Sequence, residues 1–404
     1  MKSICVIGAG IVGCATAYAL TRAGFQVRLL DARAGPGLGT SFANGAQLSY
    51  CYVEPLASPG TLRALPGMLL DPDSPLRFEL RWDPRQWRWG LRFLAACTAA
   101  QSERGTREVL ALAQLSRKTL DEWRERESLA FSFRRNGKLV LCPDQTTLDR
   151  QRRQVRFQST LGCEQSVLTR AECVAREPAL AAHAEHFVGG VWTADECLGD
   201  AHALCGELIR CAERDGATVE FDAEVESFEV TGNRVQAIRT SGGEVRGADG
   251  FVLAAGSHVP ALARKLGIAL PIYPIKGYSL TLPLLDPALA PEVSVTDLGQ
   301  KTVFARLNGH LRVAAMAEVV GHDLSIPPDR IERMLKSVQM LFPGACDLTQ
   351  RNEWAGLRPA TPTSVPIVGP TRLPNLFVNA GHGALGFTLA AGSAVRLVEL
   401  LVDR

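Results

Sequence analysis

The chain has 404 residues, which is too long for one ordinary hydrophobic core and suggests two domains. Its hydrophobic content of 46% is sufficient for both cores. The 44 basic side chains nearly balance the 42 acidic ones, and the net charge of +2 argues against a nucleic-acid-binding surface as the main function. A small neutral or zwitterionic substrate fits this balance better.

The N-terminal residues have the pattern of a nucleotide-binding unit. An apolar run at 3–7 predicts a strand, and a helix-like run that reaches Gly24 follows the motif GAGIVG. In such a turn Gly8 lets the chain reverse, Gly10 lets the backbone approach a pyrophosphate, and Gly13 lets the helix pack closely on the strand. The helix N-terminus then offers free N–H groups and a favourable dipole to the phosphates.

A second predicted strand, residues 25–30, ends in Asp31, close to the spacing expected of an acid that binds a ribose. A carboxylate there accepts hydrogen bonds from both ribose hydroxyls, which disfavours NADP and leaves FAD and NAD open. The alternative is a glycine-rich loop that binds nothing. The complete order of strand, turn, helix, strand and acid favours dinucleotide binding.

A second glycine-rich stretch, residues 35–49, brings Thr40, Ser41 and Asn44 together. Their hydroxyls and amide are suited to bond the phosphates or the ring edge of a cofactor. Thr40 or Ser41 could equally cap a short helix, and both interpretations stay open.

The sequence shows neither a secretion signal nor a long apolar run typical of a membrane span. No run of 18 uncharged apolar residues occurs, and the N-terminus enters a strand without a cleavable signal, so we expect the chain to fold in the cytoplasm. The eleven cysteines form no CxxC pair and indicate small buried hydrophobic residues in a reducing compartment. We expect no metal, because the spacing of Cys163, Cys173, His183 and His186 only loosely resembles that of a zinc site.

Residues 61–100 mix tryptophan with arginine. The tryptophans are Trp82, Trp87 and Trp89, and the arginines are Arg77, Arg81, Arg85, Arg88 and Arg92. This composition is used by helices at membrane interfaces. The favoured interpretation is a partly buried helix whose arginines face water.

The rest of the chain contains further predicted helices and strands. We expect helices at 103–127, 200–215 and 328–341, and a last helix that ends near Leu401. The expected strands are a hairpin of 131–133 with 137–141, then 189–193, 216–221, 223–225, 250–257, several runs within 271–320, and 375–380.

Motifs that carry a family resemblance run in order along nearly the whole chain. They are GAGIVG at 8–13, Asp31, TSFANGAQLSYCYVEPLASPG at 40–60, KGYSLT at 276–281, GLRPATPTSVPIVG at 356–369 and NAGHGALGFTLAAGSA at 379–394. With these motifs the chain resembles the bacterial D-amino-acid dehydrogenases of the D-amino-acid oxidase-like flavoprotein family.

The resemblance implies an α/β fold with a discontinuous, Rossmann-like FAD-binding domain of the glutathione-reductase type. A second, α+β substrate domain is built on an antiparallel sheet. We expect the FAD-binding domain to comprise residues 1–55, 198–266 and 348–404, and the substrate domain residues 56–197 and 267–347. FAD is expected to be bound without a covalent bond, because the segment around Arg358 has no tethering cysteine.

The motifs and the resemblance together predict the cofactor contacts. These are Gly8, Gly10, Ile11, Val12, Gly13, Asp31, Ala32, Arg33, Thr40, Ser41, Asn44, Gly45, Ala46, Gln47, Leu48, Val225, Ala254, Ala255, Gly256, Gly356, Arg358, Gly381, His382, Gly383, Ala384, Leu385 and Gly386. The turn at 381–386 begins the last helix, whose free amides would stabilise negative charge on the reduced flavin.

Three residues are the predicted catalytic set. Arg358 matches the position at which relatives hold a substrate carboxylate, and a guanidinium suits bidentate recognition. Tyr278 in KGYS would bond the carboxylate or cover the pocket, with core packing as the alternative. His382 lies in the turn, where a positional role is favoured over proton transfer.

The resemblance implies oxidation of a D-amino acid to a 2-oxo acid and ammonia, with hydride transfer from Cα to flavin N5. The electrons would pass to a quinone-linked acceptor, and the protein would be cytoplasmic with peripheral contact to the inner membrane as an option. A hydroxy-D-proline dehydrogenase and a glycine or sarcosine oxidase are the alternatives within the class. A non-catalytic flavoprotein subunit that binds partners is the alternative outside it.

Overall fold

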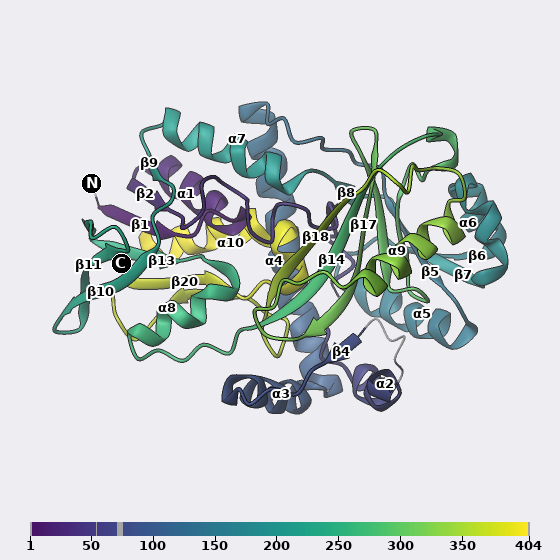
Figure 1. Ribbon diagram of the computed structural model, residues 1–404, viewed down its shortest axis with the longest axis horizontal. Coiled ribbons are helices and arrows are strands. Elements are labelled where there is room, and N and C mark those ends of the chain that lie inside the picture. The colour runs from purple at the N-terminus through teal and green to yellow at the C-terminus, as the bar shows by residue number, and fades with distance from the viewer. Residues whose placement is uncertain (1, 54, 71–75, 403–404) are drawn as a thin grey trace.

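The computed structural model describes residues 2–53, 55–70 and 76–402. Two large sheets lie side by side along the long axis of the molecule, as Figure 1 shows. One has six strands and contains the N-terminal glycine turn, and the other has nine strands. The candidate site forms where segments from both sheets meet.

The six-stranded sheet is assembled from distant parts of the chain. Its strands, in spatial order, are β19 (Ile367–Pro370), β20 (Leu376–Ala380), β13 (Gly250–Leu253), β1 (Ser3–Ile7), β2 (Gln26–Leu30) and β9 (Thr218–Glu220). All neighbours are parallel except β19 and β20. β1 and β13 are almost fully apolar and buried, as expected of strands covered on both faces. The predicted discontinuous α/β fold is therefore confirmed.

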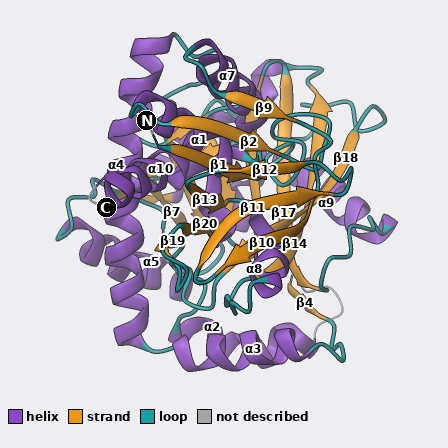
Figure 2. Cartoon of the chain, turned by 90° about the vertical axis from the view of Figure 1, so that its left-hand side faces the viewer, coloured by secondary structure: helices purple, strands orange, loops and turns teal. Residues whose placement is uncertain are grey.

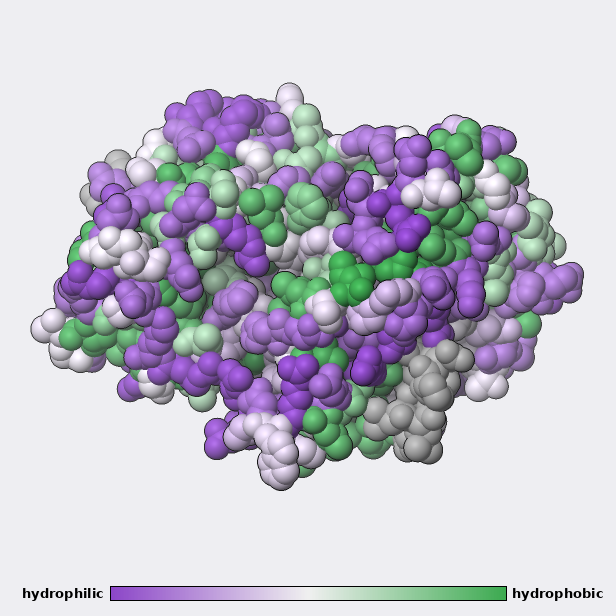
Figure 3. Space-filling view, viewed as in Figure 1, coloured by the Kyte–Doolittle hydropathy of each residue, from purple (hydrophilic) through white to green (hydrophobic). Residues whose placement is uncertain are grey.

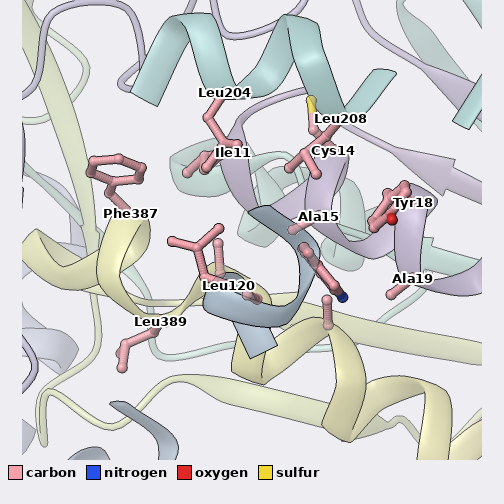
Figure 4. Packing of buried hydrophobic residues seen from close by; sticks show 14 of the residues in the cluster. Ile11, Cys14, Ala15, Tyr18, Ala19, Leu120, Leu204, Leu208, Phe387 and Leu389 are labelled. Atoms are coloured by element: carbon pink, nitrogen blue, oxygen red, sulfur yellow. The ribbon is translucent and has the colours of Figure 1, made fainter. Parts of the chain in front are cut away.

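Helices pack around this sheet and form the largest core. They are α1 (Ile11–Arg22), α4 (Ala99–Glu127), α7 (Ala201–Arg214) and α10 (Gly386–Val402). Figure 4 shows their apolar side chains converging, with Ile11 and Ala15 of α1 near Leu204 of α7, Leu120 of α4 and Phe387 of α10. Within the described residues, Gly383–Val402 is the one segment long and apolar enough to span a membrane, but it packs here against α1 and α4.

The nine-stranded sheet is mainly antiparallel. Its strands run in the order β18 (Asn352–Ala360), β14 (Tyr273–Pro283), β17 (His310–Val319), β16 (Thr302–Leu307), β15 (Ser294–Asp297), β5 (Lys138–Cys142), β7 (Gly189–Thr193) and β6 (Ser166–Thr169), with β4 (Leu76–Phe78) pairing to β17. The pairs β15–β5 and β17–β4 are parallel. Helix α9 (Pro328–Leu341) covers one face, where Leu280, Val313 and Met334 are fully buried.

Smaller elements complete the molecule. They are α2 (Pro59–Leu70), α3 (Pro84–Ala96), α5 (Gln145–Ser159), α6 (Arg170–Arg176), α8 (Val259–Lys265), the two-stranded sheet of β3 (Gln47–Leu48) and β8 (Cys197–Leu198), and the three-stranded sheet of β10 (Val225–Thr231), β11 (Arg234–Thr240) and β12 (Val245–Gly247). Short 3-10 helices lie at Pro178–His186, Gly256–His258, Pro287–Leu289 and Gly383–Leu385. In Figure 2, α2 and α3 form a separate layer at the edge of the molecule.

The predicted hairpin of 131–133 with 137–141 is wrong. Phe131 is buried in the core around α10 and is not in a strand, and β5 pairs instead with β7 and β15. Packing against Phe387 outweighs the strand tendency of the aromatic residues. The eleven cysteines are all free and buried, as the sequence predicted.

The four residues with loosely zinc-like spacing do not form one cluster, although the rings of His183 and His186 stack at 4.7 Å. Cys163 and Cys173 belong to separate cores, and His183 contacts Asp297 at 3.2 Å. Among residues 2–53, 55–70 and 76–402 there is no group of three or more side chains that could hold a metal ion.

Candidate functional site

The turn between β1 and α1 is shaped by three glycines with different surroundings. Gly8 has φ +112°, and a Cβ there would lie 2.6 Å from the Cα of Ala255. A Cβ on Gly13 would lie 1.7 Å from the carbonyl oxygen of Gly8. Gly10 is different, because the nearest atom to its Cβ is the Ser41 Oγ at 3.7 Å. Gly8 and Gly13 are thus required by the fold, whereas Gly10 leaves the room that a bound pyrophosphate needs.

Polar groups gather at the N-terminus of α1. The Asp31 carboxylate accepts hydrogen bonds from the backbone N–H of Ala9 at 2.6 Å and of Arg33 at 2.8 Å. The Ser41 hydroxyl accepts from the N–H of Ile11 at 3.0 Å. Thr40 donates to the carbonyl of Leu357 at 2.8 Å. Neither hydroxyl caps a short helix, so the capping alternative does not apply, and both instead tie segment 40–48 to its neighbours.

Further predicted contacts converge on this edge of the parallel sheet. Ala254 and Ala255 follow β13 and lie against Gly8. The carbonyls of Asp31 and Arg33 accept from the N–H groups of Ala223 and Asp222, which brings the segment before Val225 alongside. The carboxyl ends of β1, β2 and β13 thus meet where ligands bind in open α/β sheets.

Segment 40–48 crosses from α1 to the nine-stranded sheet. The Ser279 hydroxyl donates to the carbonyl of Ala43 at 2.6 Å, and Arg312 donates to the carbonyl of Asn44 at 3.0 Å. Gly45 packs against Val303, whose Cγ2 would lie 3.1 Å from a Cβ at that glycine. Gln47 and Leu48 form β3. Residues Asn44 to Leu48 are therefore held between the two large sheets.

The second predicted glycine turn lies next to β18. Gly381 has φ +86°, and a Cβ there would lie 2.7 Å from the Thr361 side chain. Gly383 has φ +56°, and no atom lies within 4 Å of its Cβ position. Residues 383–385 form a short 3-10 helix that leads into α10 at Gly386, and Ala360 bridges to His382. Open space beside a helix N-terminus suits a flavin edge that carries negative charge.

Arg358 is a half-buried cation without a carboxylate partner in the described part of the chain. Its Nη1 donates to the carbonyl of Met316 at 2.7 Å, and burial lowers the pKa of the guanidinium to about 10, so it stays protonated at neutral pH. A Cβ on Gly277 would lie 2.3 Å from the guanidinium, which therefore lies flat on that glycine. Because a charge partly withdrawn from water without a partner is costly, the site is suited to receive an anion.

A bulge in β17 aims the Met316 carbonyl at Arg358. Met316 is in the left-handed region with φ +67°, and the register between β14 and β17 shifts between Lys276 and Tyr278. A bulge of this kind bends a strand and redirects its backbone groups, and bulges are common beside active sites. The sequence carried no signal for this contact.

Tyr278 lies on the opposite face of the sheet from Arg358. Arg358 is paired in register with Ile275, three residues from Tyr278, and an odd offset along a strand reverses the side. Tyr278 is 1% exposed and its hydroxyl donates to Glu318 at 2.7 Å. Burial and this hydrogen bond raise the pKa of Tyr278. The structure does not bring the two residues together, and these contacts support the packing alternative.

The Glu318 carboxylate joins a buried charge network behind the bulge. Arg330 lies 2.9 Å from one of its oxygens and Lys276 lies 3.6 Å from the other. Lys276 also pairs with Asp323 at 2.8 Å. The network fixes β14 and β17 on the face that α9 covers.

His382 is buried and neutral. Its Nε2 lies 3.1 Å from the Ser393 hydroxyl, and burial lowers the pKa of the imidazole to about 3. A group with so low a pKa is a poor base at neutral pH, and these contacts support a positional role.

Lys138 is a buried residue of this region that sequence reasoning missed. Its Nζ donates to the Ser49 hydroxyl at 2.9 Å and lies 4.2 Å from the centre of the Tyr52 ring. Burial lowers its pKa to about 8. Ser49 in turn donates its N–H to Thr388 at the start of α10, at 3.0 Å. A lysine within the apolar run KLVLC was the available signal.

The geometry fits a bound flavin dinucleotide. It provides an open glycine turn, an acid at the end of β2, a second open turn at the N-terminus of α10 and, beside that turn, a half-buried arginine without an ion-pair partner among the described residues. The Thr40 contact to Leu357 ties segment 40–48 to the strand that carries Arg358.

Comparisons with known proteins agree with this geometry. The family model described as DAO, FAD dependent oxidoreductase, matches residues 3–400. The chain is 47% identical to "D-amino acid dehydrogenase 2" of Ralstonia nicotianae, covering 99% of this chain and 96% of the relative. It is also 47% identical to "D-amino acid dehydrogenase 2" of Pseudomonas aeruginosa, covering 100% and 95%.

Solved structures share the fold at low identity. L-proline dehydrogenase from P. horikoshii matches with a TM-score of 0.79 at 18% identity, covering 100% of this chain and 93% of the other. Glycine oxidase from Bacillus cereus matches with a TM-score of 0.75 at 18% identity, covering 100% and 95%. Together with the sequence relatives, these matches confirm the predicted flavoprotein fold and the predicted cofactor. The chain therefore belongs to the DAO family of FAD-dependent oxidoreductases.

Proposed function

We propose that this protein oxidises D-amino acids to 2-oxo acids and ammonia. The observation that carries the proposal is Arg358, a half-buried guanidinium beside the α10 turn that has no carboxylate partner in the described residues. The α-carboxylate of an amino acid supplies that partner. The full-length relatives named for D-amino acids support the D configuration.

The residues that would hold FAD lie in the two glycine turns and between them. Gly10 and the N-terminus of α1 would receive the pyrophosphate, and Asp31 would accept from the ribose hydroxyls. Residues 44–48 would lie along the ring, with the turn at 381–386 at its edge. When bound, FAD supplies a two-electron acceptor that takes the Cα hydrogen as hydride at N5.

The chain's own residues orient the substrate for this step. Arg358 binds the carboxylate and so fixes where Cα lies, while its guanidinium lies on Gly277 and the Trp354 ring lies on Gly356. The substrate needs no side-chain base once its amino group is neutral, because the nitrogen lone pair forms the imine as the hydride leaves. Water then hydrolyses the imine to the 2-oxo acid and ammonia. No step of this reaction requires a proton transfer by His382.

Product analysis tests this proposal. Turnover of D-alanine with a soluble dye should yield pyruvate and ammonia in equal amounts. One two-electron reduction of the dye should accompany each D-alanine oxidised. Turnover restricted to hydroxy-D-proline, or to glycine and sarcosine, would contradict it and favour one of the narrower enzymes. No turnover with any amine would favour a non-catalytic flavoprotein subunit.

We further propose a membrane quinone as the electron acceptor, with the protein cytoplasmic and in peripheral contact with the inner membrane. The relatives named dehydrogenases support an acceptor other than oxygen. Fast reduction of a quinone analogue with little hydrogen peroxide is the expected result. Oxygen consumption that equals the rate of dye reduction would make the protein an oxidase instead.

A further inference from the structure

Helix α3 is apolar on two sides. One side buries Trp89 and Phe93 against β14 and its neighbours. The other side exposes Trp87 to 49%, Leu91 to 66% and Leu94 to 41%. These three residues are spaced by four and three positions and therefore form one stripe along the helix. The described residues leave this stripe at least two-fifths exposed.

The loop before α3 extends the stripe. Leu80 is 67% exposed and Trp82 fully exposed. Trp87 donates its ring N–H to the carbonyl of Arg81 at 3.0 Å, so loop and stripe are adjacent. Seven of the sixteen exposed large hydrophobic side chains in the described residues fall within 56–94. Such a concentration marks an interaction surface.

Free positive charge accompanies the stripe. Arg88 and Arg92 are exposed on the same helix, one turn apart, and neither forms an ion pair with another described residue. The nearby Arg81 and Arg85 are paired with Glu79 and Asp83. We call the set of Leu80, Trp82, Trp87, Arg88, Leu91, Arg92 and Leu94 the α3 face.

We propose that the α3 face docks on the surface of an anionic lipid bilayer. Tryptophan rings and leucines suit the boundary between headgroups and acyl chains, and unpaired arginines suit anionic headgroups. The face is carried by a helix at the edge of the molecule, as Figures 1 and 2 show. In Figure 3 the same edge combines strongly hydrophobic and strongly hydrophilic residues. A projecting, convex surface of this kind suits a flat bilayer better than a peptide, because peptides usually bind in grooves.

The α3 face is rigidly tied to the candidate site. Trp89 donates its ring N–H to the carbonyl of Ala360 at 2.8 Å, two residues beyond Arg358 on β18. Just before α3, β4 pairs with β17 through Leu76 and Ala317, next to the Met316 bulge. A docked enzyme would therefore hold its site at a fixed height above the bilayer in which a quinone dissolves. Docking would bring the enzyme to the membrane quinone proposed above. Only this purpose of docking rests on the proposed function.

Flotation of the FAD-loaded protein with lipid vesicles tests docking. We expect binding to vesicles of phosphatidylcholine mixed with phosphatidylglycerol, weaker binding to phosphatidylcholine alone, and release at high salt. Each arginine near an anionic surface contributes a factor of about five, so Arg88→Ala with Arg92→Ala should lower the partition coefficient about 30-fold. The matched control is Arg153→Ala with Arg156→Ala on α5, which are also exposed, and its partition coefficient should not change.

Tryptophan emission gives a second readout. Anionic vesicles should shift the emission of the wild type to shorter wavelength, and Trp82→Phe with Trp87→Phe should abolish the shift. Equal flotation of the α3 and control variants, or no flotation of the wild type, overturns the proposal and leaves a protein partner as the occupant. Vesicle binding is measured without substrate, and activity with a soluble dye is measured without vesicles. Failure of docking is thus distinguishable from failure of the proposed function.

Discussion

Replacing Arg358 by leucine should remove most activity while leaving the fold and FAD in place. The guanidinium is half-buried, hydrogen-bonded to the Met316 carbonyl and without a carboxylate partner in the described residues, so a bound substrate would supply its counter-charge and bury the pair. Removing one member of a buried charge pair costs about 2–5 kcal/mol. At about 1.4 kcal/mol for each factor of ten, kcat/KM for D-alanine should fall roughly 30- to 4,000-fold.

The assay compares kcat/KM, FAD content and the urea midpoint of each variant. Arg358→Lys keeps the positive charge but not the bidentate geometry of the guanidinium, so its kcat/KM should lie between those of the wild type and Arg358→Leu. Arg351→Leu is the matched control, because Arg351 is exposed and forms a surface ion pair with its neighbour Glu353, so its loss should cost little. The methyl ester of D-alanine should be a poor substrate for the wild type, and Arg358→Leu should discriminate against it far less. Near wild-type efficiency of Arg358→Leu, with FAD bound, would show that the arginine is structural.

Three further predictions concern the cofactor turns and pH. Gly13→Ala should fail to fold, because its Cβ would lie 1.7 Å from the Gly8 oxygen. Gly10→Ala should give a native circular dichroism spectrum but lose FAD. A Gly10→Ala protein that retains FAD would refute the assigned phosphate position. Acid precipitation should release intact FAD, and yellow colour left in the pellet would indicate a covalent bond. Burial lowers the pKa of His382 from 6.5 to about 3, so the unfolded state binds the extra proton and stability should fall as pH drops below 6.5. The free energy of unfolding should therefore be about 2 kcal/mol lower at pH 5 because of His382. Urea midpoints measured at pH 5 and 7 should show this decrease for the wild type, and His382→Gln should lack this contribution.

Local signals made the nucleotide-binding half of the fold predictable. The turn at Gly8 needs a positive φ and Gly13 needs close packing, so the glycines had to appear in the sequence. The predicted helix 328–341 coincides with α9, since its apolar residues recur at helical spacing and bury one face. The end of β2 at Leu30, just before Asp31, follows from the same kind of local pattern.

Contacts set by strand register were not predictable from local patterns. The motif KGYS placed Tyr278 near the site in sequence, but its pairing with Ala355 turns the side chain toward α9 and away from Arg358. The bulge at Met316 depends on how β14 and β17 align, and no glycine marks it. The local pattern likewise predicts a hairpin of 131–133 with 137–141, because the competing contact of Phe131 to Phe387 comes from a distant helix. Such long-range packing overrides strand propensity.

Anaerobic mixing of the purified protein with each enantiomer of alanine tests the central claim most directly. Hydride transfer from the substrate Cα must bleach the oxidised flavin absorbance without any added acceptor. We predict rapid bleaching by D-alanine, slow or no bleaching by L-alanine, and loss of the D-alanine response in Arg358→Leu. Bleaching by both enantiomers at similar rates, or by neither, would contradict the proposed oxidation of D-amino acids.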